Sequence, residues 1–419
     1  MLTDVARSLG ATLVPGGVTG RPKVWRAEDG LSLTLGPVID ANGSRITSVF
    51  RLVVTSEQLP LDLEIEVANL STALKRAIYG ADIQLGVPAI DAALAIRTEN
   101  ELDAVARLHA PAREAALAAT RIGAIFQGGE WRCDLTDIAP NAETIVARAN
   151  LLWEAARTLA ARGPIADRLL ASVRSDPSPG YRRRSLELMV RHHLATAPQA
   201  IQIALEDPDV SVALRAAVHA GADGVAVLHR IVRQPGPEDV RVEALEHLSA
   251  AADSPDLRAT LDALVNRSPR RLRCAALRLM VRIGYGPIAR LSRLVGDGDA
   301  EVRAHAAGAL RHAGPPPQPP LLTLLADKDE AVAAAAARSL GLIADADQVG
   351  TLLARAEGLF TSGDLKQAVR QAVATIQARY GGPEAAGRLA LAERPPPDAG
   401  HLTLTDDGRL SRAEPLESE

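Results

Sequence analysis

Histidine and cysteine are the side chains of this sequence best suited to hold a metal ion or to act as nucleophiles. Zinc sites use them at short, characteristic spacings such as C-x-x-C and H-E-x-x-H. The chain contains neither spacing, and its two cysteines, Cys133 and Cys274, are far apart. Seven of the nine histidines fall in one region, where we expect exposed or half-buried helix positions: His192, His193, His219, His229, His247, His305 and His312. The sequence therefore predicts no metal site, no other cofactor and no disulfide, with Cys274 as a small buried side chain.

Motifs for hydrolysis and phosphate binding are also missing. No G-x-S-x-G occurs, and the glycine-rich segment 15–22 lacks the G-K-[ST] of a phosphate loop. Glu64 and Glu66 share one face of an expected strand, but no neighbouring segment predicts the cleft that paired catalytic carboxylates require. We therefore expect the protein not to be an enzyme.

Charge gives a more specific indication. The net charge is −4, which disfavours a dedicated duplex-binding protein, since phosphate neutralisation supplies much of the affinity for nucleic acid. Residues 258–303 nevertheless hold ten arginines against four acidic residues. Arg271, Arg278 and Arg282 are spaced to share one face of a helix, and guanidinium groups bind carboxylate or phosphate. A solvated face with local ion pairs, an acidic protein partner and nucleic acid all remain open; Tyr285 is the one aromatic residue available for base stacking in 258–303.

The elements that would carry these residues fall into two regions. Residues 1–160 combine β-rich segments at 31–38, 45–55 and 61–67 with a hairpin at 122–135, and with helical patterns at 71–80, 101–108, 111–119 and 141–162. From about 165 to 383 the strand signals vanish, and a repeat of 29 to 33 residues appears. It is marked by the residues that begin every second helix: Tyr181, Val210, Val240, Leu272, Val302, Val332 and Leu365. Short helices in such a repeat bury their apolar stripes only by stacking on their neighbours.

This spacing and register resemble the HEAT-like repeat family, including its PBS-lyase-like branch. The resemblance implies a right-handed superhelix of helix pairs whose second helices line a concave face. It also implies a ladder between adjacent repeats, in which a turn Asp is followed six residues later by an Arg. Asp176 with Arg182, and Asp297 with Arg303, keep that spacing, so we expect a partial ladder. Residues 80–108 resemble an uncharacterised α/β domain found ahead of HEAT arrays in some bacterial proteins.

These observations together predict an α+β N-terminal domain (1–160), an all-α HEAT-like solenoid of about seven helix pairs (161–385) and a disordered tail (386–419). The predicted function is a non-catalytic, cytoplasmic interaction scaffold with no membrane span. It would bind a protein or peptide, possibly acidic, on a concave patch that includes Arg271, Arg278 and Arg282. The alternative is a nucleic-acid-binding or DNA-glycosylase-like HEAT protein using the same arginines, and a lesser one is a bilin-lyase-like protein.

Overall fold

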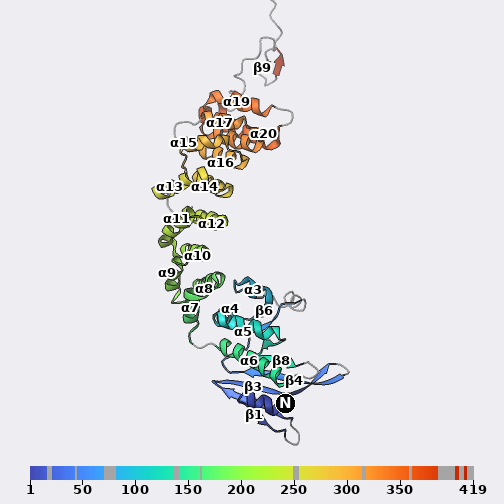
Figure 1. The fold of residues 1–419 in the computed structure, drawn as a ribbon. Coiled ribbons are helices and arrows are strands. Elements are labelled where there is room, and N and C mark those ends of the chain that lie inside the picture. Colours follow the sequence, from blue (N-terminus) through green and yellow to red (C-terminus); the bar gives the residue numbers. More distant parts are fainter. Residues whose placement is uncertain are drawn as a thin grey trace, which may run out of the picture. The chain divides into compact units, whose positions relative to one another are not determined.

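The computed structural model describes residues 1–16, 21–42, 45–69, 82–135, 141–160, 163–248, 254–313, 318–357, 361–385, 402–404 and 410–412. It has an antiparallel sheet with helices in its N-terminal part, and helices in pairs after that (Figure 1). The helix expected over 71–80 and most of the tail lie outside the described residues. Within the tail, β9 (Leu402–Leu404) pairs antiparallel with β10 (Leu410–Arg412).

Eight strands form the N-terminal sheet, in the order β1-β2-β3-β4-β8-β7-β5-β6. Their bounds are β1 Thr12–Val14, β2 Lys23–Glu28, β3 Leu31–Asn42, β4 Arg45–Thr55, β5 Glu64–Val67, β6 Leu94–Arg97, β7 Ile125–Gln127 and β8 Glu130–Leu135. The central strands alternate as a half-buried sheet should. Leu33 pairs with Val54, which pairs in turn with Trp131, and all three are buried. Strands β1, β2 and β6 carry short or weak patterns, and the sequence did not predict them.

Among the described residues, five helices accompany the sheet: α1 (Leu2–Ser8), α3 (Pro88–Ala93), α4 (Glu101–Arg107), α5 (Ala110–Arg121) and α6 (Ala142–Leu159). Helix α6 begins where expected, because Asn141 accepts a hydrogen bond from the Thr144 amide at 2.7 Å and so caps it. Its apolar stripe, which includes Ile145 and Leu152, packs on β3, β4 and β8. Helix α1 packs on α6, β1 and β2.

Helix pairs fill the rest of the described chain. The first members are α7 (Ile165–Ser175), α9 (Ala197–Leu205), α11 (Val225–Arg233), α13 (Pro255–Arg267), α15 (Ile288–Leu291) with η2 (Ser292–Gly296), α17 (Gln318–Leu325), and η3 (Ala346–Gln348) with α19 (Val349–Ala356). The second members are α8 (Pro179–Arg191), α10 (Val210–Ala220), α12 (Glu238–Leu248), α14 (Arg270–Ile283), α16 (Ala300–Leu310), α18 (Glu330–Ile343) and α20 (Gly363–Ala385). Alanine and leucine fill the interfaces between them, so the low aromatic content of the sequence is matched by many small contacts.

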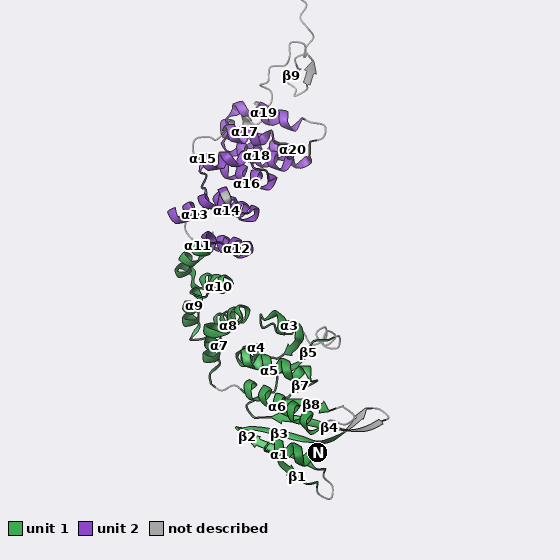
Figure 2. Cartoon of the chain, viewed as in Figure 1, with its two compact units in different colours: residues 1–231 green, residues 232–419 purple. Residues whose placement is uncertain are grey.

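The chain divides into two compact units, residues 1–231 and 232–419 (Figure 2). The first unit holds the sheet domain together with α7 to α10, and α4 packs directly on α7 and α8. In the second unit the second helices pack on one another in a row, α12 on α14, α14 on α16, α16 on α18 and α18 on α20. The domain boundary predicted at residue 160 stays a prediction, although the change from sheet to helix pairs falls there.

One stretch of the described residues, Val210–Arg233, is long and apolar enough to cross a membrane by composition. The sequence predicted no membrane span. In the structure it is divided into α10 and α11 by η1 (Gly221–Gly224), and α10 packs on α8 and α9. The 11 residues of α10 rise about 16 Å, roughly half of the hydrocarbon core of a bilayer. Length and composition are therefore weak support for a membrane span here.

Gly341 marks the closest approach of α18 and α20. A Cβ at this position would lie 2.6 Å from the Cα of Ala372, so Gly341→Ala should destabilise the protein by about 1–3 kcal/mol through overpacking. A Cβ at Gly308 on α16 would instead meet Val281 Cγ2 at 3.5 Å, an ordinary contact. Gly308→Ala should therefore be neutral or stabilise by up to about 1 kcal/mol. Urea unfolding of both variants checks this, and equal effects of the two substitutions would contradict the packing.

Candidate functional site

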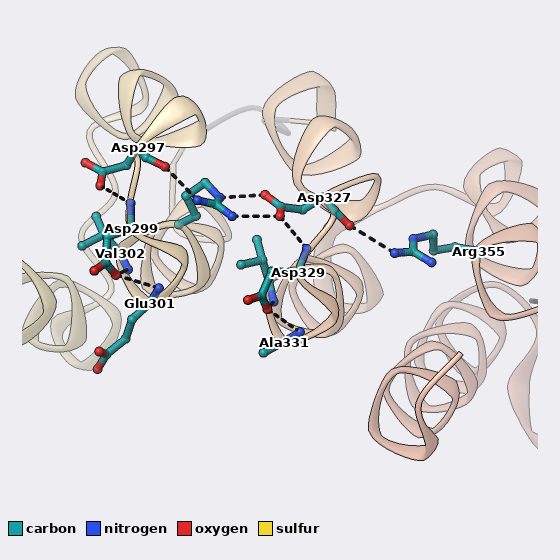
Figure 3. Close-up of polar contacts among 10 residues, drawn as sticks. Asp297, Asp299, Glu301, Val302, Asp327, Asp329, Ala331 and Arg355 are labelled. Atoms are coloured by element: carbon teal, nitrogen blue, oxygen red, sulfur yellow. Dashed lines mark hydrogen bonds and ion pairs between the residues drawn. The ribbon is translucent and has the colours of Figure 1, made fainter. Parts of the chain in front are cut away.

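The turn between α15–η2 and α16 is held by two aspartates (Figure 3). Asp297 accepts a hydrogen bond from the Asp299 amide at 3.0 Å. Asp299 in turn caps α16 by accepting from the amides of Glu301 and Val302, which would otherwise lack partners at the helix start. The contact of Asp297 with Asp299, in which an Asp carboxylate accepts from the amide two residues later, recurs in three other turns. The pairs are Asp176 with Ser178, Asp207 with Asp209, and Asp327 with Asp329.

Arg303 joins this turn to the next one. Its Nη1 donates to the backbone carbonyl of Asp297 at 2.8 Å, and its Nε and Nη2 donate to the two carboxylate oxygens of Asp327 at 2.7 and 2.9 Å (Figure 3). Both side chains are about nine-tenths buried. The fork of a guanidinium group fits a carboxylate in this two-bond geometry. The turn of Asp297 is thereby fixed to the turn of Asp327 by charge-assisted hydrogen bonds.

Arg182 makes the same three bonds in the first unit. It donates to the Asp176 carbonyl at 2.8 Å and to both oxygens of Asp207 at 2.7 Å. The four residues predicted for a ladder thus come together as two pairs, Asp176 with Arg182 and Asp297 with Arg303. In each pair the Arg binds the backbone carbonyl of the Asp and not its carboxylate. The carboxylate that each Arg binds belongs to the following turn, so Asp207 and Asp327 are ladder residues that the spacing within one repeat did not reveal.

Further arginines extend the ladder at turns where the six-residue spacing does not pair an Asp with an Arg. Arg273 binds the carboxylate of Asp297. Arg355, from α19, donates to the Asp327 carbonyl at 3.1 Å and the Leu325 carbonyl at 2.9 Å. Pro235 stands six residues before Arg241, where the ladder pattern has an Asp, and Arg241 donates instead to the Val232 carbonyl. The ladder is therefore partial, and its arginines find carbonyls where a carboxylate is missing.

The sheet domain supplies the first arginine of the ladder. Arg113 of α5 binds both carboxylate oxygens of Asp176, at 3.1 and 2.9 Å, and the pair is almost fully buried. The guanidinium of Arg113 also lies 4.0 Å from the ring centre of Tyr181, whose hydroxyl donates to the Val105 carbonyl. Burial raises the pKa of Tyr181. Arg113 lies far from Asp176 in the sequence and outside any repeat, so no spacing signal could have revealed it.

The predicted arginine patch lies on the exposed face of α14, where Arg271, Arg278 and Arg282 are all exposed. Leu272, Val302 and Val332 occupy equivalent positions in successive second helices. Counting from them, Arg278 is equivalent to Gly308 and Arg338, and Arg282 is equivalent to His312 and Leu342. Arg338 and Leu342 of α18 are also exposed, the latter by 50%. We call the residues Arg271, Arg278, Arg282, Arg338 and Leu342 the second-helix face.

Charge on the equivalent positions changes sign along the row of second helices. Helix α12 presents the exposed acids Asp239 and Glu246 where α14 presents Arg271 and Arg278. At the start of α14, Arg270 lies 2.9 Å from Asp299 and also binds Glu301. The positive charge of the second-helix face is therefore local to α14 and α18.

Residues considered for catalysis are engaged elsewhere. Arg97 of β6 binds Glu64 at 3.0 Å and also Glu66, so both carboxylates are engaged by one guanidinium across the strands. Burial lowers the pKa of His219, His305 and His312, which leaves their imidazoles neutral at pH 7.

A cavity of about 470 Å³ is lined by residues of α4, α5 and α7 and includes His109 and Asp176. Arg113 binds the carboxylate of Asp176, and the Ser175 hydroxyl donates to the Ala171 carbonyl at 3.0 Å. The Asp176 carboxylate is therefore engaged by Arg113, and the Ser175 hydroxyl is bonded within its own helix.

Comparison with known families agrees with the turn geometry of the second unit. Residues 287–358 match the family model for HEAT repeats. The match supports HEAT-like repeats in this segment, which contains the turns of Asp297 and Asp327 and therefore the ladder bonds of Arg303. No curated protein matches the chain. The resemblance of residues 80–108 to a bacterial α/β domain stays a prediction.

Loss of a ladder arginine should destabilise the second unit strongly. Arg303→Ala removes three charge-assisted bonds and leaves Asp327 buried without its partner, at an expected cost of about 3 kcal/mol. Arg303→Lys keeps the charge but not the fork and should lie between Arg303→Ala and wild type. The control is Arg290→Ala, which removes a more exposed ion pair to Asp262 and should cost under about 1 kcal/mol. Chemical denaturation measures all three, and an Arg303→Ala effect no larger than the control would refute the ladder's role.

Acid should remove the same stabilisation. Hydrogen bonds from Arg303 hold the pKa of Asp327 below its ordinary value of 3.8. The carboxylate therefore stabilises the folded protein fully at pH values above its unfolded-state pKa. This stabilisation is lost as the pH falls through the lower folded-state pKa. Melting temperatures of wild type and Asp327→Asn should differ most at pH 7 and converge below about pH 4. A difference that stays constant down to pH 3 would show that the carboxylate charge is not involved.

Proposed function

We propose that this protein is a non-catalytic scaffold that binds an acidic segment of a partner protein along α14, α16 and α18. The observation that carries the proposal is the second-helix face, where exposed arginines on α14 are followed at equivalent positions by Arg338 and Leu342 on α18. HEAT repeats, which residues 287–358 contain, form helical arrays of the kind often used for protein interaction.

The ladder separates structural arginines from surface arginines. Arg273 and Arg303 are directed to turn carboxylates and hold the stack together. Arg271, Arg278 and Arg338 lie at exposed positions of the same helices, where a partner carboxylate can reach them. Leu342 adds an exposed apolar side chain one helical turn beyond Arg338. A partner with acidic residues and an apolar residue at helical spacing fits this face.

A nucleic-acid partner is the less favoured alternative. Duplex binding draws most of its affinity from phosphate contacts, and the exposed acids Asp239 and Glu246 at equivalent positions of α12 would repel a backbone extending along the row. Tyr285, the aromatic residue nearest the patch in sequence, lies 5.1 Å from the guanidinium of Arg258, measured to the ring centre. That ring is therefore already stacked against a cation.

The proposal includes a non-catalytic role and a reducing, cytoplasmic environment. Cys133 and Cys274 are both buried thiols outside any disulfide, which accords with a compartment that does not form disulfides. An activity dependent on His109 or on Glu64 would overturn the non-catalytic part.

A peptide-binding experiment tests the proposed surface. The probe is a fluorescent amphipathic peptide with Glu and Leu at helical spacing, and its counterpart carries Lys in place of Glu. The full chain should bind the Glu peptide in a salt-sensitive manner, and Arg271→Glu with Arg278→Glu and Arg282→Glu should weaken binding about tenfold or more. The Lys peptide should not bind.

The matched control changes the same net charge on the first helices of the same unit. Arg258→Glu, Arg290→Glu and Arg293→Glu alter exposed residues of α13, α15 and η2, and this triple variant should bind as the wild type does. Equal loss in both triple variants would show nonspecific attraction. Competition by a DNA duplex at physiological salt, lost only in the α14 variant, would replace the protein-binding proposal with nucleic-acid binding.

A further inference from the structure

Three metal-ligating side chains meet where α14 packs on α16. Cys274 comes from α14, and Glu301 and His305 come from the first two turns of α16. One ligand atom of each, the Cys274 Sγ, a Glu301 carboxylate oxygen and a His305 ring nitrogen, lies within 4.8 Å of the other two. Glu301 and His305 are four residues apart and so share one helix face. No sequence motif links them to Cys274, because the site is built between two repeats.

We propose that Cys274, Glu301 and His305 form a binding site for a thiophilic divalent cation, with zinc as the best match. Thiolate, imidazole and carboxylate are the three ligand types that zinc accepts in proteins. Three protein ligands leave the fourth tetrahedral position for water, as in open rather than structural zinc sites. On binding, the thiol proton of Cys274 passes to solvent, and the charge of the ion is balanced by the thiolate and the carboxylate.

The distances require only small adjustments. Glu301 Oε1 lies 3.8 Å from His305 Nε2. Tetrahedral zinc with bonds of the usual length would bring such a pair to about 3.3 Å and each to about 3.6 Å from the sulfur. Glu301 is exposed and His305 half-buried, so both can move, whereas Cys274 is buried and fixes one corner of the site.

The surrounding charges also have defined places. Arg270 binds the other carboxylate oxygen of Glu301, Oε2, and lies 2.9 Å from Asp299, so it orients Glu301 with Oε1 toward His305. A second-sphere donor of this kind orients a ligand. Arg278 is the second cation near Cys274 and His305. These two guanidinium groups repel a cation, so the site should bind zinc more weakly than a closed site with four protein ligands does.

Comparison with the next pair of helices shows that the three residues are not part of the repeat's ordinary packing. Counting from Val302 and Val332, Cys274 is equivalent to Ala304 and Ala334, Glu301 to Ala331, and His305 to Ala335. The junction of α16 with α18 therefore places alanines at all three positions and packs without them. A stacking role alone does not require a thiol, a carboxylate and an imidazole at the junction of α14 with α16.

Cobalt titration of the reduced full-length chain tests the site. Co²⁺ bound to a thiolate gives a sulfur-to-cobalt charge-transfer band, which should appear with one equivalent and vanish when Zn²⁺ displaces the cobalt. Glu301→Gln and His305→Gln, at exposed and half-exposed positions, should weaken binding about tenfold or more. Cys274→Ser should abolish the band.

Matched controls separate the site from adventitious binding. His312→Gln, at the end of α16, and Cys133→Ser, in the sheet of the first unit, should leave the titration unchanged, and thermal melting confirms that each variant is folded. Absence of the band in the wild type would overturn the proposal. So would a band that survives Cys274→Ser, or equal weakening by His312→Gln and His305→Gln. If Cys274→Ser fails to fold, Glu301→Gln decides, because its side chain lies at the surface.

Discussion

The stack of helix pairs depends on pairing each turn carboxylate that the next helix pair buries. A charged group removed from water is costly unless it is paired and hydrogen-bonded. Asp327 meets that requirement with two bonds from Arg303 and one from the Asp329 amide. Arg303 meets its own with the Asp297 carbonyl. One buried pair therefore fixes the turn, starts the next helix through Asp329 and sets the register between neighbouring repeats.

The same constraint explains how the sheet domain and the first helix pairs form one compact unit. The first turn Asp, Asp176, has no preceding repeat to supply an arginine, and Arg113 of α5 takes that place. Packing of α4 on α7 and α8 completes this junction, with Asp103 of α4 paired to Arg168 of α7. The sheet domain thus acts as the N-terminal cap that a solenoid needs to cover its first repeat.

Function, in this account, uses the helix positions that stacking leaves over. Stacking consumes the alanines, the leucines and the ladder arginines, and it leaves one face of each second helix exposed. On α14 and α18 that face is basic, with Leu342 as an apolar addition, and at the α14–α16 junction the exposed Glu301 and the half-buried His305 lie beside the buried Cys274. Surface residues of this kind vary from repeat to repeat because the stack does not depend on them.

The sequence predicted the repeats because their period reflects local helix physics, and it placed α4, α5, α6 and the β7–β8 hairpin from local patterns. It found Asp176, Arg182, Asp297 and Arg303 by spacing but could not tell which carboxylate each arginine binds, since that partner lies in another repeat. The ladder role of Arg113 and the cluster at Cys274 were not predicted for the same reason. Contacts between elements that share no periodic pattern leave no signal in a single sequence.

A double-mutant cycle on Arg303 and Asp327 tests the central claim most directly. The free energies of unfolding of Arg303→Ala, Asp327→Ala and the double variant isolate the coupling between the two side chains. We expect a coupling energy between Arg303 and Asp327 above about 1.5 kcal/mol, because the pair is buried and doubly hydrogen-bonded. A coupling near zero, with the two single losses simply adding, would show that the repeats stack without the ladder.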